Sequence, residues 1–372
     1  MIIMALDHVR DLIHIHSITQ SPTDLATTTP LLFFTRWVTY LCAPVFVFLA
    51  GTSAYLYGTK NEAIPSNRRF LIQRGIWLIW LEFFIVNFGL FFDSGYHTIL
   101  FEVLASTGIG FIILGLLLNQ RAGTIAMIGV AILVFHNLAP LIPFSEPSII
   151  KKVLLPLFAP GALPMGSRTF IVGYPPIPWL GIMLVGFGAG KIVQQDIQRR
   201  KKLWLNLGLV CLILFSVIRF INRYGDAVRW SVQKNSLFTV LSFLNVSKYP
   251  PSLDYCLMTL GVMFLIFANS ESIKSKIVDI ISVYGRVPLF YFLIHFYFIH
   301  LIMIAIMLAQ GFEWSQLDFA LGHFGRPKGV ESGLTLAWIY VIWIAVVSIL
   351  YLPCTWYDKI KTGNRYWWLR YL

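Results

Sequence analysis

Five ionisable residues lie together in the first apolar segment of the chain, which reads MIIMALDHVRDLIHIH. They are Asp7, His8, Arg10, Asp11 and His14. On a helix these residues would occupy about two turns. Ionisable groups in a lipid environment are costly unless they are paired or hydrated. A chain that keeps five of them together in an apolar segment is therefore expected to use them.

The two histidines are candidates for acid–base chemistry. Histidine titrates near neutral pH, so His8 or His14 could take a proton and return it within one reaction cycle. Asp7 or Asp11 could orient an imidazole and stabilise its charged form. We therefore treat Asp7, His8 and His14 as catalytic candidates. The alternative is a neutralised ion cluster that only packs, because Asp7 shares a helix face with Arg10 and Asp11.

Other polar residues fall inside apolar segments farther along the chain. Arg36, Glu102 and His295 are expected to join Arg10 and Asp11 in binding substrate or stabilising an oxyanion. The alternative for Arg36 is that its charged end only reaches the membrane interface, an arrangement known as snorkelling. The alternative for His295 is a core histidine whose hydrogen bonds are satisfied by its surroundings. Glu82, in another apolar segment, is equally compatible with a structural role.

The composition is typical of a protein that crosses the membrane several times. Of the 372 residues, 57% are hydrophobic and only 12% are charged, against about 25% charged in soluble domains. The net charge of +12 does not indicate nucleic-acid binding, because the basic residues lie in short loops. The four scattered cysteines lack metal-ligand spacing, and we expect no metal site. No polar segment is long enough for a second domain, so residues 1–372 are predicted to form one integral membrane domain.

Apolar runs predict an all-α bundle of about ten spans. The first is short, which indicates either a missing upstream turn or a helix close to one face of the membrane. Basic residues recur after spans two, four, six and eight, so both termini are predicted to be cytoplasmic. The predicted spans are 1–16, 31–57, 70–92, 98–118, 122–142, 175–193, 203–222, 252–269, 286–308 and 334–354.

This orientation places most of the titratable residues in the outer half of the bundle. Such an arrangement is expected of a cavity that opens outward. Three Pro-rich segments, 156–166, 174–179 and 247–252, lie in or beside the long outer loops. They are interpreted as turns and lids around that cavity, or as simple connections.

Five stretches in order resemble bacterial membrane proteins of the heparan-alpha-glucosaminide N-acetyltransferase catalytic-domain family. They are MIIMALDHVRDLIH, FFTRWVTYLCAPVFVFLAGTSAYLYG (33–58), PWLGIMLVGFGAG (178–190), KYPPSLDYCLMTLG (248–261) and GRVPLFYFLIH (285–295). The APVFVFLAG block and the Asp–His pair of the first helix are the most specific. The resemblance runs through nearly the whole chain.

The resemblance implies a transmembrane acyltransferase. The lysosomal enzyme of this family takes acetyl from cytosolic acetyl-CoA and delivers it to an amino sugar on the lumenal side. Its catalysis is attributed to a histidine and an asparagine in and just after the first helix of the domain, and the polar pair falls near Asp7 and His8 here. Family members usually carry a stretch of the type Ser-x-Asp-x-x-Arg-Gly just before this region. Its absence here leaves two alternatives open, a native start upstream of Met1 or a trimmed form of the family domain.

The predicted function is transfer of an acyl group, most simply acetyl, from cytoplasmic acyl-CoA to a sugar or glycan outside the bacterial inner membrane. Acyl-CoA is expected as a co-substrate, with no tightly bound cofactor. Its phosphates would be attracted by Arg68, Arg69 and Arg74 or by the basic run 199–202, whose alternative role is topology alone. The other expected partner is the lipid bilayer, and assembly into a homodimer is left open. The alternatives to an enzyme are a proton-coupled transporter or flippase and a structural subunit.

Overall fold

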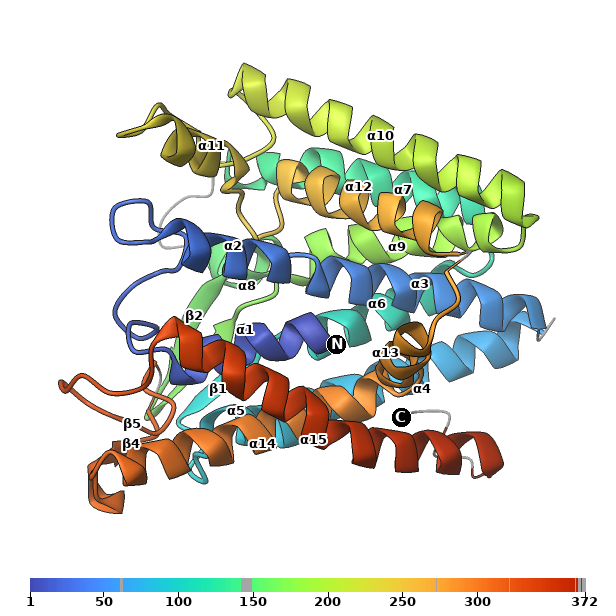
Figure 1. The fold of residues 1–372 in the computed structure, drawn as a ribbon. Coiled ribbons are helices and arrows are strands. Elements are labelled where there is room, and N and C mark those ends of the chain that lie inside the picture. Colours follow the sequence, from blue (N-terminus) through green and yellow to red (C-terminus); the bar gives the residue numbers. More distant parts are fainter. Residues whose placement is uncertain are drawn as a thin grey trace.

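The computed structural model describes residues 1–60, 63–141, 149–271, 273–320, 322–364, 366 and 369. Over these residues the chain forms a bundle of helices that run roughly side by side, with two small sheets at one end (Figure 1). We refer to this end as the sheet end. The prediction of an all-α bundle is confirmed.

Among the described residues, eight helical segments are long and apolar enough to cross a membrane. Two more helices lie where spans were predicted but are shorter, α1 (Ile2–Ile13) with 12 residues and α6 (Val103–Leu117) with 15. The eight long segments are Pro30–Lys60, Ile64–Phe91, Ala122–Ala139, Pro176–Val193, Ile197–Ile221, Leu253–Ser270, Pro288–Ala309 and Leu336–Gly363.

These segments contain most of the named elements. The helices are α2 (Pro30–Thr39), α3 (Cys42–Lys60), α4 (Ile64–Leu81), α5 (Asn87–Phe91), α7 (Ala122–Phe135), α9 (Pro176–Val193), α10 (Ile197–Ile221), α12 (Leu253–Ser270), α14 (Pro288–Ala309) and α15 (Leu336–Gly363). Shorter helices are α8 (Ile149–Phe158), α11 (Ser236–Leu244), α13 (Lys276–Arg286), the π-helix η1 (Glu82–Val86) and the 3-10 helices η2 (His136–Leu141) and η3 (Trp314–Gln316). The strands are β1 (Thr98–Phe101), β2 (Gly161–Met165), β3 (Arg168–Val172), β4 (Leu317–Asp318) and β5 (Arg326–Pro327).

Helix α1 carries the ionisable cluster and occupies only the half of the bundle nearest the sheet end. Its 12 residues span about 18 Å, well short of the roughly 30 Å hydrocarbon core of a bilayer. Figure 1 shows it starting near the middle of the bundle and running to the sheets. There the backbone of Leu334 pairs with the end of α1, through Leu334 N to Ile13 O and Ile15 N to Leu334 O, each 2.9 Å. This pairing fixes the depth of the cluster.

The predicted span 98–118 begins as a strand rather than a helix. Strand β1 pairs in parallel with β3, which also forms a hairpin with β2. Because the carboxyl ends of parallel neighbours meet at one edge, Glu102 and Tyr174 are brought close together. The amides of Gly173 and Tyr174 both donate to Phe101 O, at 3.0 and 3.2 Å. The sheet therefore places the side chains of Glu102 and Tyr174 near each other at the sheet end of the bundle.

Helices α3 and α9 approach so closely that their backbones touch. A Cβ atom on Gly51 would lie 2.0 Å from Met183 O, and one on Gly186 would lie 2.1 Å from Phe48 O. Thr52 Oγ1 donates to Gly186 O across the same interface at 2.9 Å. Small residues that permit such contact are typical of helix packing in membranes. This interface fixes α3, which carries residues of both cavities described below.

Replacing Gly51 by leucine is expected to destabilise the protein, because the side chain would overlap a backbone carbonyl that cannot move away. Overpacking of this kind costs roughly 1–3 kcal/mol or more. The measurement is the midpoint of thermal unfolding in detergent. Gly123→Ala is the matched control, since a Cβ there meets nothing within 4 Å. Equal midpoints for the two variants would contradict the close contact.

Candidate active site

A cavity of about 250 Å³ lies in the half of the bundle nearest the sheet end. We call it the polar cavity, because four of the predicted site residues line it: Asp7, His8, Asp11 and Glu102. Tyr249, which is 41% exposed, also lines it and marks its mouth. The sequence thus identified four residues that the fold brings to one cavity. Aromatic side chains complete the wall, among them Tyr174, Phe292, Phe296 and Phe324.

Asp7 is the centre of a buried ion network. Arg10 donates to Asp7 Oδ1 at 2.8 Å and also lies 2.7 Å from Asp11, while Arg36 pairs with the other oxygen of Asp7. The side chain of Arg10 is 2% exposed and that of Asp7 8%, whereas that of Asp11 is 46% exposed. Buried charges need such partners. Neither arginine lines the polar cavity, so the oxyanion role expected of Arg10 or Arg36 is less direct than the sequence indicated.

The imidazole of His8 forms part of the cavity wall. Its ring packs 4.4 Å from the ring of Phe296 and 5.1 Å from that of His295, centroid to centroid. His8 lies beside Asp7 in the chain and three residues from Asp11 on the same helix. It is the histidine of the first segment that the fold places in the cavity.

His295 stands behind His8 and is completely buried. Its Nδ1 lies 2.6 Å from Phe292 O and 3.1 Å from Tyr291 O. Carbonyl oxygens only accept hydrogen bonds, so Nδ1 carries the proton and Nε2 holds a lone pair. Nε2 is buried with no partner among the described protein atoms. His295 can therefore accept a hydrogen bond from a neighbouring N–H group, and the ring of His8 is the imidazole beside it.

Glu82 stabilises the start of α6, the helix that Glu102 precedes. It starts the π-helix η1, and its Oε2 accepts from Leu104 N at 2.8 Å and from Ala105 N at 3.2 Å. A carboxylate at the start of α6 satisfies amide groups that lack helical partners. Glu102 precedes that helix and lines the polar cavity. The geometry gives Glu82 a structural task and leaves Glu102 facing the cavity.

Sequence reasoning missed the cation of the polar cavity. Lys248 is 7% exposed, and its Nζ lies 5.0 Å from the ring centroid of Tyr249 and 5.8 Å from that of Tyr174. It is the basic side chain in the described wall of this cavity. These residues belong to two of the three Pro-rich segments, 174–179 and 247–252. These segments were expected to form turns and lids or simple connections, and Lys248 was not among the candidate site residues.

His14 lies outside the polar cavity. It is buried at the end of α1, with its ring 5.8 Å from that of His16. Its carbonyl accepts from Arg326 Nη1 at 2.8 Å, and the same guanidinium bonds Ser17 Oγ at 2.9 Å and Ile15 O at 3.1 Å. Burial lowers the pKa of Arg326 to about 10, so the group stays charged at neutral pH. Arg326 therefore clamps the end of α1 to the loop before α15.

Replacing Arg326 by glutamine is expected to loosen the end of α1 and lower the unfolding midpoint. Hydrogen bonds to charged groups contribute about 1.5–3 kcal/mol each, so a total loss of roughly 3 kcal/mol is expected. Thermal unfolding in detergent measures it. The exposed Arg229→Gln is the control. A midpoint for Arg326→Gln equal to that of the control would show that the clamp does not hold α1.

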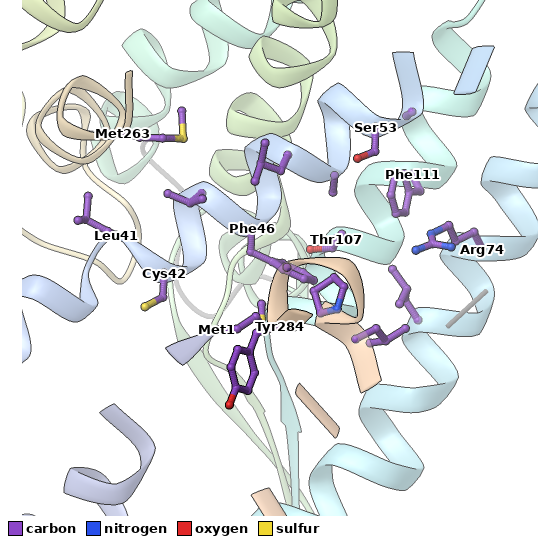
Figure 2. A pocket seen from close by; sticks show the side chains of 18 of the residues that line it. Met1, Leu41, Cys42, Phe46, Ser53, Arg74, Thr107, Phe111, Met263 and Tyr284 are labelled. Carbon is purple, nitrogen blue, oxygen red and sulfur yellow. The ribbon is translucent and has the colours of Figure 1, made fainter. Parts of the chain in front are cut away.

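A second cavity, of about 770 Å³, shares Cys42 and Phe46 with the wall of the polar cavity. We call it the apolar cavity, because most of its wall is hydrophobic, including Leu41, Phe111 and Met263. Figure 2 shows side chains from several helices around this space. Its wall continues to Arg74 of α4 and Lys361 of α15, in the half of the bundle away from the sheets (Figure 1). Cys42 and Phe46 are the described residues that line both cavities.

Of the three arginines predicted to bind acyl-CoA, Arg74 lines the apolar cavity. Arg68 Nε donates to Gly115 O at 3.2 Å, and the side chain of Arg69 is exposed. In the basic run 199–202, Arg200 forms an ion pair with Glu271. Lys361, which sequence reasoning did not select, is the second basic residue of this cavity. The sequence does little to indicate a binding role for Lys361, because the residue lies in a basic C-terminal tail of the kind that sets membrane topology.

The family model of the heparan-alpha-glucosaminide N-acetyltransferase catalytic domain matches residues 1–221, more than half of the chain. The chain belongs to this family. The family predicted from the sequence is thereby confirmed, although two of the five similar stretches, 248–261 and 285–295, lie outside the match. Membership implies an integral membrane acetyltransferase. Comparisons with curated proteins and with solved structures gave no match.

The matched part of this family member contains the ion network, His8 and Glu102. His295 and Lys248 lie beyond residue 221, in the part of the chain that the family model does not match. The fold nevertheless brings His295 against His8 and Lys248 into the same cavity wall. The candidate site is therefore built from both halves of the chain.

Proposed function

We propose that this protein transfers an acetyl group from acyl-CoA in the apolar cavity to a sugar or glycan in the polar cavity. The observation that carries this proposal is that the two cavities are neighbours that share Cys42 and Phe46 in their walls, with His8 in the wall of the polar cavity. One cavity suits a flexible, largely apolar arm, and the other suits a hydroxylated or amino acceptor. The family supports acetyl transfer as the reaction.

The apolar cavity is the proposed donor site. Its volume of about 770 Å³ falls within the range of roughly 300–1,000 Å³ found for ligand pockets. The pantetheine arm of acyl-CoA would lie along its hydrophobic wall. Arg74 and Lys361 would attract the phosphates, which approach from the end of the bundle away from the sheets. By the distribution of basic loops, that end faces the cytoplasm.

The polar cavity is the proposed acceptor site. At about 250 Å³ it has room for one sugar unit rather than an extended chain. Asp11 and Glu102 can accept hydrogen bonds from hydroxyl or amino groups. Tyr174 and Phe292 offer aromatic faces to a sugar ring. The mouth at Tyr249 opens toward the outer side of a bacterial inner membrane in the proposed orientation.

His8 is the proposed general base. It takes the proton from the acceptor amine or hydroxyl as that group attacks the thioester carbonyl carbon. The carbon–sulfur bond then breaks, and the CoA sulfur leaves with the proton returned by His8. Lys248 would stabilise the negative charge on the carbonyl oxygen. The lone pair on His295 Nε2 would accept the His8 N–H and so hold His8 in the tautomer that a base requires.

Binding of acyl-CoA to the purified protein in nanodiscs tests the donor site. Thermal shift with acetyl-CoA, free CoA and ATP separates recognition of the CoA unit from general phosphate binding. Saturable stabilisation by acetyl-CoA and CoA, but not by ATP, is expected. Stabilisation by none of the three, together with movement of a sugar driven by a proton gradient, would replace the enzyme with a transporter or flippase.

A further inference from the structure

We propose that Phe46 is the residue that limits the acyl group to a short chain. This inference rests on the proposed function and adds to it a determinant of donor specificity. Phe46 lies at the junction of the donor and acceptor cavities. An acyl group attached to CoA in the apolar cavity must pass this junction to reach His8.

The junction is formed by one face of α3. Cys42 and Phe46 are four residues apart, so their side chains lie one turn from each other on the same side of the helix. Cys42 is small, and the aromatic ring of Phe46 supplies most of the bulk. Figure 2 shows Phe46 projecting from α3 toward the centre of the apolar cavity.

The ring of Phe46 is held in place from the acceptor side. It stacks on Phe292 of α14, with centroids 6.4 Å apart and planes inclined by 20°. Phe292 in turn packs 5.2 Å from Phe296, whose ring contacts His8 at 4.4 Å. A continuous aromatic wall therefore runs from the junction to the proposed base. Because packed rings resist displacement, the opening cannot widen freely for a longer chain.

This geometry makes acyl size the property that the junction selects. An acetyl group carries a single methyl group beyond its carbonyl carbon, so the space near His8 has to hold only that methyl group. The chain of a hexanoyl group would meet the ring of Phe46 or the wall behind His8. Removal of the ring takes away part of the wall that the two cavities share and is expected to leave more room for the chain. The bonds that form and break during transfer stay the same, and only the accepted chain length changes.

The test compares initial rates of CoA release from acetyl-CoA, butyryl-CoA and hexanoyl-CoA, with glucosamine as the acceptor probe. In Phe46→Ala the ratio of hexanoyl to acetyl rates is expected to rise at least tenfold, as is typical for methylene discrimination in a pocket. Leu56→Ala is the matched control, because Leu56 lies on the same helix and is not among the residues that line either cavity. Its ratio is expected to equal that of the unmodified protein.

Two further variants keep the proposal testable if Phe46→Ala does not fold. Phe46→Leu is expected to shift the ratio in the same direction by a smaller factor. Cys42→Phe adds a second ring beside Phe46 and is expected to lower the ratio of hexanoyl to acetyl rates below that of the unmodified protein. An unchanged ratio in the folded Phe46 variants, in a protein that turns over acetyl-CoA, overturns this inference alone. No turnover and no CoA-selective binding in the unmodified protein overturns the proposed function and this inference with it.

Discussion

Replacement of His8 by alanine is expected to reduce acyl transfer by at least about a hundredfold, the usual contribution of a general base. His8 is the imidazole in the wall of the polar cavity, and no other described histidine lines that cavity. The loss arises because the acceptor retains its proton as it attacks the thioester. The measurement is the initial rate of acetyl transfer at saturating acetyl-CoA, alongside the unfolding midpoint.

His14→Ala is the matched control for this loss. His14 lies on the same segment, but it is buried beside His16 and does not line the cavity. It is expected to keep most of the activity. His295→Ala is expected to fall between the two, since it acts through His8 rather than on the substrate. A fully active, folded His8→Ala protein would remove His8 from the mechanism.

Replacement of Asp7 by asparagine is expected to cause the largest loss of stability among single changes in the site. Asp7 pairs with both Arg10 and Arg36, and its side chain is 8% exposed. The change keeps the shape of the side chain but removes the acidic partner of Arg36 and leaves Arg10 with the half-exposed Asp11 alone. Removing one member of a buried ion pair costs about 3–5 kcal/mol. Chemical or thermal unfolding in detergent measures the difference.

Asp11→Asn provides the comparison for Asp7→Asn. Asp11 also contacts Arg10, but its side chain is 46% exposed. An exposed pair contributes about 0–1 kcal/mol, so this variant is expected to unfold near the midpoint of the unmodified protein. The double variant Asp7→Asn/Arg36→Gln is expected to recover part of the stability. Equal stability of the two single variants would mean that the network is hydrated and not buried.

The sequence predicted the helical bundle well, because lipid leaves the chain few options. Backbone groups in a bilayer must be satisfied internally, so long apolar runs become helices. Each predicted span corresponds to a helix in the described structure. Within the ionisable cluster of the first segment, Asp7, Arg10 and Asp11 pair with one another, whereas His14 lies apart from them. The pairs of Asp7 with Arg10 and of Arg10 with Asp11 follow directly from helical spacing.

The remaining parts of the site depend on contacts that no local pattern contains. Strand β1 was missed because Thr98–Phe101 is as apolar as the helix that follows, and only pairing with β3 makes it a strand. Lys248 enters the cavity because its loop folds back over Tyr174. His14 was grouped with His8 by proximity in the chain, yet the helix ends at Ile13 and turns it away. The two cavities arise from tertiary packing, since side chains of α1, α3, α6 and α14 line both of them.

Transfer of labelled acetyl across sealed proteoliposomes is the most direct test of the account. Acetyl-CoA carrying a labelled acetyl group is supplied on the side of Arg74 and Lys361, and glucosamine is enclosed on the side of Tyr249. The account predicts labelled N-acetyl product inside, formed by the unmodified protein and lost in His8→Ala. Binding of acetyl-CoA with no labelled product from glucosamine or a panel of other sugar amines and hydroxyls would contradict it.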